Sequence, residues 1–335
     1  MDAVLLAGGF GTRLRPLTYT KPKPLLPVAG RPMLEWVLDR LPPEVDRVIV
    51  AVNWLAEALE AYFDARPEDG RNLRFQVVRE TEPLGTAGAV RNALGGEDAA
   101  PTEPFYVLNG DILSSMDLAA VAAQHKATGA AATISLKEVP AEDVVHYGVA
   151  RLDEADARRL RGFVEKPADP ADAPSRLINA GAYLLQPEVL DLIPAGRLVS
   201  MEKEVFPAIL AGGCDDRGLW GVPFEGHWID VGDPARLRQA TLDLGDGTLF
   251  TAPPLVDDGA HIDGTIGGSG ILIGAGAHVT DCVLGDGVQV APGARITDCV
   301  IGDGEAVGGE HHGERIWTRA PPEGYPQKQV GNALA

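Results

Sequence analysis

A glycine-rich run near the start of the chain carries side chains suited to binding phosphate. The apolar segment Ala3–Ala7 leads into the run G-G-F-G-T-R-L-R of residues 8–15, and Lys23 follows between two prolines. Glycines let backbone N–H groups approach a phosphate closely because no Cβ lies in the way. Arginine and lysine supply positive charge for the phosphate oxygens. The run therefore predicts a polyphosphate-binding loop at the end of the first strand, where open α/β sheets bind ligands.

Two common phosphate-loop motifs do not fit this run. In the pattern G-x-G-x-x-G counted from Gly9 the third glycine would fall at Leu14, and the pattern G-x-x-x-x-G-K-[ST] is absent. The string G-G-F-G-T-R-L-R-P-L-T with P-K-P-L-L-P-V resembles the signature of the sugar-1-phosphate nucleotidyltransferases. The resemblance implies that the loop wraps a nucleoside triphosphate and that Arg13 and Lys23 hold its phosphates. The loop residues that it assigns to the nucleotide are Leu6, Ala7, Gly8, Gly9, Gly11, Thr12 and Arg13.

Two aspartates are the candidate ligands of a metal ion. Asp111 follows the apolar segment Phe105–Leu108, and an aspartate at the carboxyl end of a buried strand is well placed to hold a cation. Mg²⁺ prefers one or two carboxylates together with substrate phosphates. A plain turn is the alternative for the tripeptide N-G-D at residues 109–111. Asp230 lies in W-I-D-V-G, which matches the family's W-x-D-x-G, so the resemblance makes Asp230 the second Mg²⁺ ligand.

The resemblance extends to segments for the base, the ribose and the sugar. The residues that it assigns to the nucleobase and ribose side are Glu82, Pro83, Leu84, Gly85, Thr86 and Ala87, and Gly110 is a further expected nucleotide-binding residue. Those that it assigns to the sugar phosphate are Gly148, Glu165, Lys166 and Asn179. In the family the glutamate of V-E-K-P binds sugar hydroxyls, the lysine meets the sugar phosphate, and the asparagine of N-A-G binds sugar. The plainer alternatives are a helix start capped by Thr86 and a surface ion pair of Glu165 with Lys166.

The implied reaction joins a sugar 1-phosphate to a nucleoside triphosphate and releases pyrophosphate. The attacking phosphate oxygen is already an anion, so catalysis needs positioning and charge neutralisation rather than a general base. The residues that the resemblance makes catalytic are Arg13, Lys23, Asp111, Lys166 and Asp230.

Specificity within the family is indicated by two further segments. The runs E-P-L-G-T-A-G at residues 82–88 and S-M-E-K-E-V-F-P at residues 200–207 are most similar to mannose-1-phosphate guanylyltransferases, which favours GTP and mannose 1-phosphate as substrates and GDP-mannose as product. The alternatives are a glucose-1-phosphate thymidylyl- or uridylyltransferase and a non-catalytic regulatory subunit that binds nucleotide sugars. An acyltransferase site using His261 or His278 is a less favoured hypothesis.

The elements that must position these residues alternate between strand and helix. The expected strands are Asp46–Val52, Leu73–Arg79, Phe105–Leu108, Ala131–Leu136 and Leu160–Val164, and the expected helices are Trp54–Ala65, Thr86–Leu94 and Asp117–Thr128. We expect Asp117 to be an N-cap, and Asp233 with Pro234 to be the N-cap and first position of a further helix. This order predicts a Rossmann-like three-layer α/β domain with a mostly parallel, mixed sheet. We expect this nucleotidyltransferase domain to span residues 1–245.

After residue 250 an internal repeat replaces the helical pattern. Val256, Ile273, Val290 and Val307 are equally spaced, and two further sets of isoleucine and valine follow the same spacing. Such short units predict a β-solenoid, and they resemble the hexapeptide repeats of a left-handed β-helix. We expect this β-helix over residues 250–309 and an irregular tail over residues 310–335.

Charge and composition limit the partners and the location that we expect for the protein. The 335 residues carry a net charge of −19, which argues against a nucleic-acid partner because such partners require a basic face. The sequence contains no apolar run long enough to span a bilayer and no signal-peptide pattern at its N-terminus, so we expect a cytoplasmic protein without a membrane partner. The three cysteines have no C-x-x-C spacing. Cys282 and Cys299 fall one repeat apart, which favours a stacked pair of small residues over the alternative of a redox pair. Because the end of a solenoid needs covering, we expect a homo-oligomer.

Overall fold

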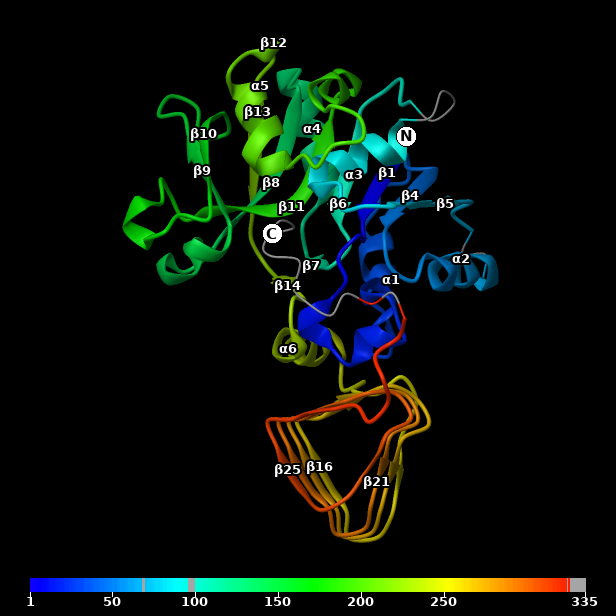
Figure 1. Cartoon of the computed structure of the whole chain (residues 1–335). Helices are drawn as coiled ribbons and strands as arrows, with labels where there is room; N and C mark the ends of the chain where they lie inside the picture. Colours follow the sequence, from blue (N-terminus) through cyan, green and yellow to red (C-terminus); the bar gives the residue numbers. More distant parts are fainter. Residues whose placement is uncertain (68–69, 96–99, 324, 326–335) are drawn as a thin grey trace. The chain divides into compact units, whose positions relative to one another are not determined.

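The computed structural model describes residues 1–67, 70–95, 100–323 and 325. The chain divides into two compact units (Figure 1). Among the described residues, the first contains Met1–Gly8 and Leu38–Trp228, and the second contains Gly9–Val37 and those from Ile229 to Tyr325. This grouping distributes residues 1–245 over both units, because the segment that begins with Gly9 groups with the C-terminal part of the chain.

The first unit is built on a mixed sheet, for which nine strands are seen among the described residues. Seven of them follow the order β10-β9-β11-β6-β1-β4-β5, and β8 joins β11 to β13. The pairs β1–β4, β1–β6, β4–β5 and β8–β13 are parallel, whereas β11 is antiparallel to β6, β8 and β9. The strands are β1 (Asp2–Leu6), β4 (Arg47–Val52), β5 (Arg74–Arg79), β6 (Phe105–Asn109), β8 (Ala132–Glu138), β9 (Gly148–Leu152), β10 (Leu160–Glu165), β11 (Leu177–Leu185) and β13 (Leu219–Phe224).

The buried apolar runs explain the parallel part of the sheet. All residues from Val48 to Val52 in β4 are buried, and so are Ala3–Leu5 in β1. Strands covered on both faces have continuous apolar runs of this kind. The expected strands at these places are confirmed, while the antiparallel insertion of β11 between β6 and β9 has no signal in its own residues.

Helices lie against this sheet, as Figure 1 shows for α3 and α4. In α4 the Asp117 side chain accepts a hydrogen bond from Ala119 N at 2.8 Å, which confirms the expected N-cap, and Gly129 in left-handed backbone ends the helix. The helices and short strands between the sheet strands are α2 (Ala56–Ala65), α3 (Gly85–Leu94), β7 (Ile112–Ser114), α4 (Leu118–Thr128), η4 (Ala141–His146), η5 (Pro170–Asp172), η6 (Pro187–Leu192), η7 (Met201–Val205), α5 (Phe206–Leu210) and β12 (Gly213–Asp216).

The second unit combines the N-terminal loop segment with the solenoid. In α6 the side chain of Asp233 caps the N-terminus by accepting from Arg236 N, and Pro234 takes the first helical position, as the sequence predicts. The unit boundaries fall within α1 and within β14, so each of these two elements has residues in both units. The elements before the solenoid are η1 (Thr12–Leu14), η2 (Leu17–Tyr19), η3 (Lys23–Leu25), β2 (Pro27–Val28), β3 (Arg31–Pro32), α1 (Met33–Leu38), β14 (Trp228–Asp230) and α6 (Pro234–Leu244).

Three parallel ladders make up the solenoid, consistent with the expected left-handed β-helix. The repeat is confirmed, since Ile273 pairs with both Val256 and Val290, and Val279 pairs with Ile262 and Ile296. Figure 1 shows the coils stacked with three flat sides. The ladders are β15 (Leu255–Val256), β18 (Leu272–Ile273), β21 (Gln289–Val290) and β24 (Ala306–Val307); β16 (His261–Asp263), β19 (His278–Thr280), β22 (Arg295–Thr297) and β25 (Glu310–His312); and β17 (Ile266–Gly267), β20 (Val283–Leu284), β23 (Val300–Ile301) and β26 (Arg315–Ile316).

The solenoid extends past residue 309, where the sequence repeat fades. Glu310–His312 pairs with β22, and Arg315–Ile316 pairs with β23. Arg295 lies opposite His278 on one side and Glu310 on the other, so this last coil is shorter than the one before it, and a search at constant spacing misses it. Residues 310–316 therefore belong to the solenoid rather than to the expected irregular tail. Of that tail, residues 324 and 326–335 lie outside the described part of the chain.

The interior of the solenoid contains two of the three cysteines. Cys282 and Cys299 are buried one coil apart with free thiols. Burial raises the pKa of Cys282 to about 11, which fits a packed pair rather than a redox pair.

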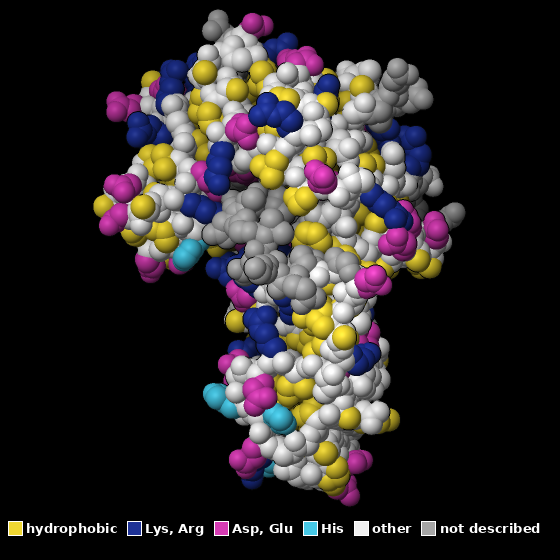
Figure 2. Space-filling view, in the orientation of Figure 1, with side chains coloured by type: hydrophobic (Ala, Val, Ile, Leu, Met, Phe, Trp, Pro, Cys, Tyr) yellow, Lys and Arg dark blue, Asp and Glu magenta, His cyan; other side chains and the backbone are white. Residues whose placement is uncertain are grey.

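On the face shown in Figure 2, acidic and basic side chains are interspersed rather than gathered by sign. Within the described residues, none of the helices has the length and apolar character needed to cross a membrane.

Candidate active site

Five residues of the first unit that we predict to bind the nucleotide or the metal ion lie at the carboxyl ends of β1 and β6. Ala7 N donates to Ala51 O at 2.9 Å, and Gly110 N donates to Leu6 O at 2.9 Å. A Cβ on Gly110 would lie 3.0 Å from that same carbonyl oxygen, so glycine permits the close approach. Asp111 follows directly and is half-buried. Leu6, Ala7, Gly8, Gly110 and Asp111 thus meet at the carboxyl edge of the parallel strands, where such sheets bind ligands.

Glu80 lies beside this edge, and sequence analysis did not single it out. A Cβ on Gly8 would lie 2.7 Å from Glu80 Oε1, so the Gly8 backbone packs directly against the carboxylate. Glu80 Oε2 accepts from Leu84 N at 3.1 Å, so the same side chain contacts the segment predicted to bind the base. Burial raises the pKa of Glu80, although the Leu84 N–H opposes that shift.

Asn53 is a second residue that the sequence did not reveal. Its amide nitrogen lies 3.7 Å from the Cβ position of Gly8. Both amide atoms, Oδ1 and Nδ2, are buried and have no hydrogen-bond partner among the described residues. A buried amide without partners costs free energy unless a ligand or water satisfies it. Glu80 and Asn53 therefore present a carboxylate and an amide next to Gly8.

The start of α3 is fixed by backbone contacts with Val199. Gly85 has φ of +72°, and a Cβ there would lie 2.5 Å from Val199 O, so both conformation and space require glycine. Ala87 N and Gly88 N donate to Val199 O at 3.0 and 3.2 Å. Ala87 is fully buried by this packing.

The hydroxyl of Thr86 does not cap α3. The N-cap position belongs to Leu84, which offers no side-chain hydrogen bond. Thr86 Oγ1 instead donates to Glu202 Oε2 at 3.0 Å and accepts from Met201 N at 2.8 Å. The capping alternative is therefore wrong. Of the neighbouring predicted residues, Glu82 is exposed and Pro83 is half-buried.

The predicted sugar residues of the first unit lie on β9, β10 and β11. Gly148 pairs with Glu165 across β9 and β10, and a Cβ on Gly148 would lie 2.5 Å from Glu165 Oε2. That oxygen is buried without a hydrogen-bond partner among the described residues. Burial first, and the charge of Glu202 second, raise the pKa of Glu165. Lys166 follows in left-handed backbone, with φ of +48°, and its N–H donates to Tyr147 O at 3.0 Å.

A chain of hydrogen bonds joins Asn179 to the start of α3. Asn179 Nδ2 donates to Tyr183 Oη at 2.8 Å, and Tyr183 Oη donates to Glu202 Oε1 at 3.4 Å. Glu202 also accepts from Thr86. Glu202 lies in the short π-helix η7, a geometry that is frequent at functional sites. The structure thereby connects the predicted sugar side with the predicted base side through a residue of the run 200–207, for which the sequence indicated specificity but no contact.

The predicted phosphate residues of the second unit lie on short 3₁₀ turns. Gly11 has φ of +60° and precedes η1, which contains Thr12 and Arg13. A Cβ on Gly232 would lie 2.7 Å from Arg13 Nη2, so the guanidinium lies against the backbone two residues after Asp230. Arg13 is exposed, and its guanidinium has no hydrogen bond or ion pair within the described part of the chain.

The remaining predicted residues of the second unit are Gly9, Lys23 and Asp230. Gly9 has open space where a Cβ would stand, and Lys23 begins η3. Asp230 ends β14, and its carbonyl accepts from Gly232 N at 2.8 Å. The expected metal pair, Asp111 and Asp230, combines one residue from each unit, and its meeting over one cation stays a prediction.

Comparison with known proteins adds independent findings. The family model described as nucleotidyl transferase matches residues 2–247. A mannose-1-phosphate guanylyltransferase of Mycobacterium tuberculosis is 39% identical over 272 residues, which are 78% of this chain and 71% of that protein. Mannose-1-phosphate guanylyltransferase 1 of Arabidopsis thaliana is 37% identical over 268 residues, 79% of this chain and 70% of that protein.

Solved structures share the fold at lower identity. A UDP-glucose pyrophosphorylase complexed with UDP-glucose has a TM-score of 0.62 and 22% identity, covering 72% of this chain and 97% of that chain. The UDP-glucose pyrophosphorylase of Acinetobacter baumannii has a TM-score of 0.60 and 24% identity, covering 73% of this chain and 93% of that chain. The family model covers most of the chain and the curated relatives exceed a third identity, so the chain belongs to the nucleotidyl transferase family.

Proposed function

We propose that the chain transfers a guanylyl group from GTP to mannose 1-phosphate, giving GDP-mannose and pyrophosphate. Relatives that bear the name mannose-1-phosphate guanylyltransferase support this assignment at 37–39% identity over more than three quarters of the chain. The catalytic machinery is drawn from residues 1–245, because every residue to which we give a role falls in that range. We propose that the protein acts in the cytoplasm, and that the solenoid serves as an assembly surface of a homo-oligomer.

The observation that carries the choice of base is the pair Glu80 and Asn53. Guanine presents two adjacent N–H donors, on N1 and on the 2-amino group, and one carboxylate accepts from both. Uracil and thymine present a single N–H between two carbonyl oxygens. Burial of Glu80 is unfavourable to its charged form, and two N–H donors would offset that cost. The amide of Asn53, buried without a partner among the described residues, supplies a further donor and acceptor for the nucleoside.

The transferring groups are held by charge. Arg13 and Lys23 neutralise the departing pyrophosphate, and Lys166 meets the phosphate of the incoming sugar. The attack is in line on the α-phosphorus by a phosphate oxygen that is already anionic, so these residues bind and orient rather than remove a proton. Glu165 accepts from sugar hydroxyls, which would satisfy the oxygen that has no partner among the described residues.

Nucleotidyl transferases of this family generally use a divalent metal ion, and we propose Mg²⁺. The donors fit this ion, because Asp111 and Asp230 offer hard carboxylate oxygens at strand ends and substrate phosphates complete such sites. The ion would neutralise charge on the α-phosphate. Asp111 and Asp230 would hold it.

A rate matrix tests the proposed substrates. GTP, UTP, dTTP and ATP are each assayed against mannose, glucose and N-acetylglucosamine 1-phosphates by pyrophosphate release. We expect the highest kcat/KM for GTP with mannose 1-phosphate. Preference for UTP or dTTP would instead support a uridylyl- or thymidylyltransferase. Binding of GDP-mannose without any turnover would support a regulatory subunit.

A further inference from the structure

The phosphate loop, residues 9–18, is contacted by the C-terminal part of its own unit. Tyr325 is buried, and its hydroxyl donates to Phe10 O at 2.7 Å. The same hydroxyl lies 3.0 Å from Thr18 Oγ1, which donates to Gly11 O at 2.9 Å. Two consecutive loop carbonyls are thus fixed by one hydroxyl pair, and Tyr325 is separated from Phe10 by 315 residues of sequence.

Fixing these carbonyls also fixes the two N–H groups behind them. In a trans peptide the N–H points opposite to the C=O of the same unit. Holding Phe10 O therefore sets the direction of Gly11 N–H, and holding Gly11 O sets that of Thr12 N–H. Within the described residues neither N–H has an acceptor. Both are available to phosphate, on the side of the loop away from Tyr325.

The last solenoid coil holds the following part of the loop. Arg315, in β26, donates through Nη1 to Arg13 O at 2.5 Å and to Arg15 O at 3.2 Å. These bonds use the carbonyl of Arg13 and leave its guanidinium available to phosphate. Aromatic packing adds to the same region, since the Tyr19 ring lies 5.3 Å from that of Trp317 and 4.9 Å from that of Tyr325, centroid to centroid.

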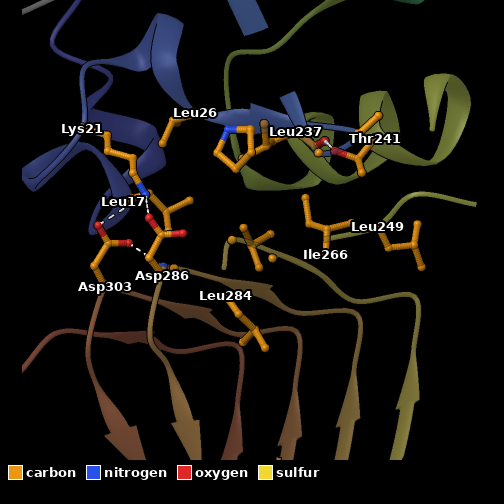
Figure 3. A pocket seen from close by; sticks show the side chains of 17 residues that line it. Leu17, Lys21, Leu26, Leu237, Thr241, Leu249, Ile266, Leu284, Asp286 and Asp303 are labelled. Atoms are coloured by element: carbon orange, nitrogen blue, oxygen red, sulfur yellow. Dashed lines mark hydrogen bonds and ion pairs between the residues drawn. The ribbon is translucent and has the colours of Figure 1, made fainter. Parts of the chain in front are cut away.

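Earlier coils hold the chain just after the loop in the same way. Figure 3 shows Lys21 directed at Asp286 and Asp303, which occupy equivalent places on neighbouring coils. Lys21 forms an ion pair with Asp286, and Thr20 Oγ1 donates to Asp303 Oδ2 at 2.6 Å. Because hydrogen bonds and ion pairs depend on angle, these contacts fix the direction of each polar group as well as its place.

We propose that the C-terminal brace, consisting of Arg315, Trp317 and Tyr325, holds the phosphate loop in its nucleotide-binding conformation, with Tyr325 and Arg315 as positioning residues. This inference rests on the proposed function, because it assigns the loop to the nucleotide phosphates. It gives the solenoid a role in substrate binding besides assembly.

The test compares two conservative substitutions in one aromatic cluster. Tyr325→Phe removes the hydroxyl that contacts Phe10 and Thr18 but keeps the ring. Tyr19→Phe is the matched control, because the Tyr19 hydroxyl makes no hydrogen bond within the described residues. We expect KM for GTP to rise about tenfold in Tyr325→Phe, the effect of one lost hydrogen bond, with KM for mannose 1-phosphate unchanged. Tyr19→Phe keeps wild-type values.

A ligand-free measurement separates this inference from the proposed function. Hydrogen exchange follows Leu14 N–H, which donates to Gly11 O at 2.9 Å inside the loop. We expect about tenfold faster exchange in Tyr325→Phe than in Tyr19→Phe, together with weaker binding of inorganic tripolyphosphate. Arg315→Lys, which loses the guanidinium donor, provides a second variant with the same expectation.

The outcomes are distinct for the two proposals. If the wild-type chain binds tripolyphosphate but turns over no sugar phosphate, the proposed function fails while the exchange result still decides the brace. If Tyr325→Phe and Arg315→Lys match Tyr19→Phe in exchange, in KM and in tripolyphosphate binding, the brace is overturned. A lower melting temperature with unchanged KM and exchange also overturns it, because it shows a structural role alone.

Discussion

At the scale of single residues, Glu80 is where the choice of base is tested. Glu80→Gln keeps an acceptor for Leu84 N–H but replaces the second acceptor oxygen by an amide NH2 group, which only donates. The side chain can then no longer accept from both guanine donors. We expect kcat/KM for GTP to fall about 10- to 100-fold, with the ratio of UTP to GTP rates rising.

Glu60→Gln is the control for this substitution. Glu60 forms an exposed ion pair with Arg79, the residue before Glu80. Its loss leaves base selection unchanged, since exposed pairs contribute little. Equal GTP preference in Glu80→Gln and wild type would contradict the role of Glu80 in reading the base.

Asp111 tests the metal assignment. Asp111→Ala removes one of two proposed Mg²⁺ ligands from a half-buried position at a strand end. We expect a loss of about 3 kcal/mol or more in transition-state stabilisation, measured by kcat/KM, with an unchanged circular dichroism spectrum. A folded variant with near-normal turnover would remove Asp111 from the metal site.

Local signals were predictable from the sequence, and long-range neighbours were not. Asp117 and Asp233 were recognised as caps because capping depends on residues three positions away or fewer. Glu202 lies in the run at residues 200–207 that indicates specificity, but its own role was missed because its contact with Thr86 joins residues 116 positions apart. Glu80 lies two residues before the matched motif and becomes visible only when Gly8 packs against it.

At the scale of elements, His125 couples helix α4 to strand β8 and gives the fold a pH dependence. Its Nδ1 lies 2.9 Å from Thr133 Oγ1 and its Nε2 lies 3.0 Å from the amide nitrogen of Gln186. The amide nitrogen donates, so Nε2 accepts and the ring is neutral. Burial lowers the pKa of His125 to about 4.

The sign of the effect follows from proton uptake. Between pH 6.5 and 4 the unfolded chain binds a proton at His125 that the folded chain does not, so stability is complete above pH 6.5 and is lost as the pH falls toward 4. Relative to His125→Gln, we expect wild type to lose about 2 kcal/mol of unfolding free energy between pH 7.5 and 5, measured with urea. A pH-independent difference between the two proteins would contradict this account.

The elements themselves were predicted unevenly. Apolar runs and turn residues located β4, β5, β6 and the helices α2, α3 and α4, because each is a local pattern. The pairing of β11 with strands from three different parts of the chain depends on tertiary contacts and could not be read locally. The final coil was missed because it is shorter than the coils that define the repeat.

At the scale of the whole molecule, the division into units does not follow the order of the chain. The boundary near residue 245 was placed where the repeat begins, which is a property of sequence texture. The structure groups Gly9–Val37 with the solenoid, because contacts such as Lys21 with Asp286 tie that segment to distant coils. The predicted site residues therefore fall in both units, and the solenoid contacts the phosphate loop within the second.

The stoichiometry of the products is the decisive test of guanylyl transfer by this chain. The full chain is incubated with GTP, mannose 1-phosphate and Mg²⁺, and GDP-mannose and pyrophosphate are quantified together. The account predicts that they form in equal amounts, and that both disappear with a chelator and in folded Asp111→Ala. Release of GDP and inorganic phosphate, or product formation that survives the chelator, would contradict it.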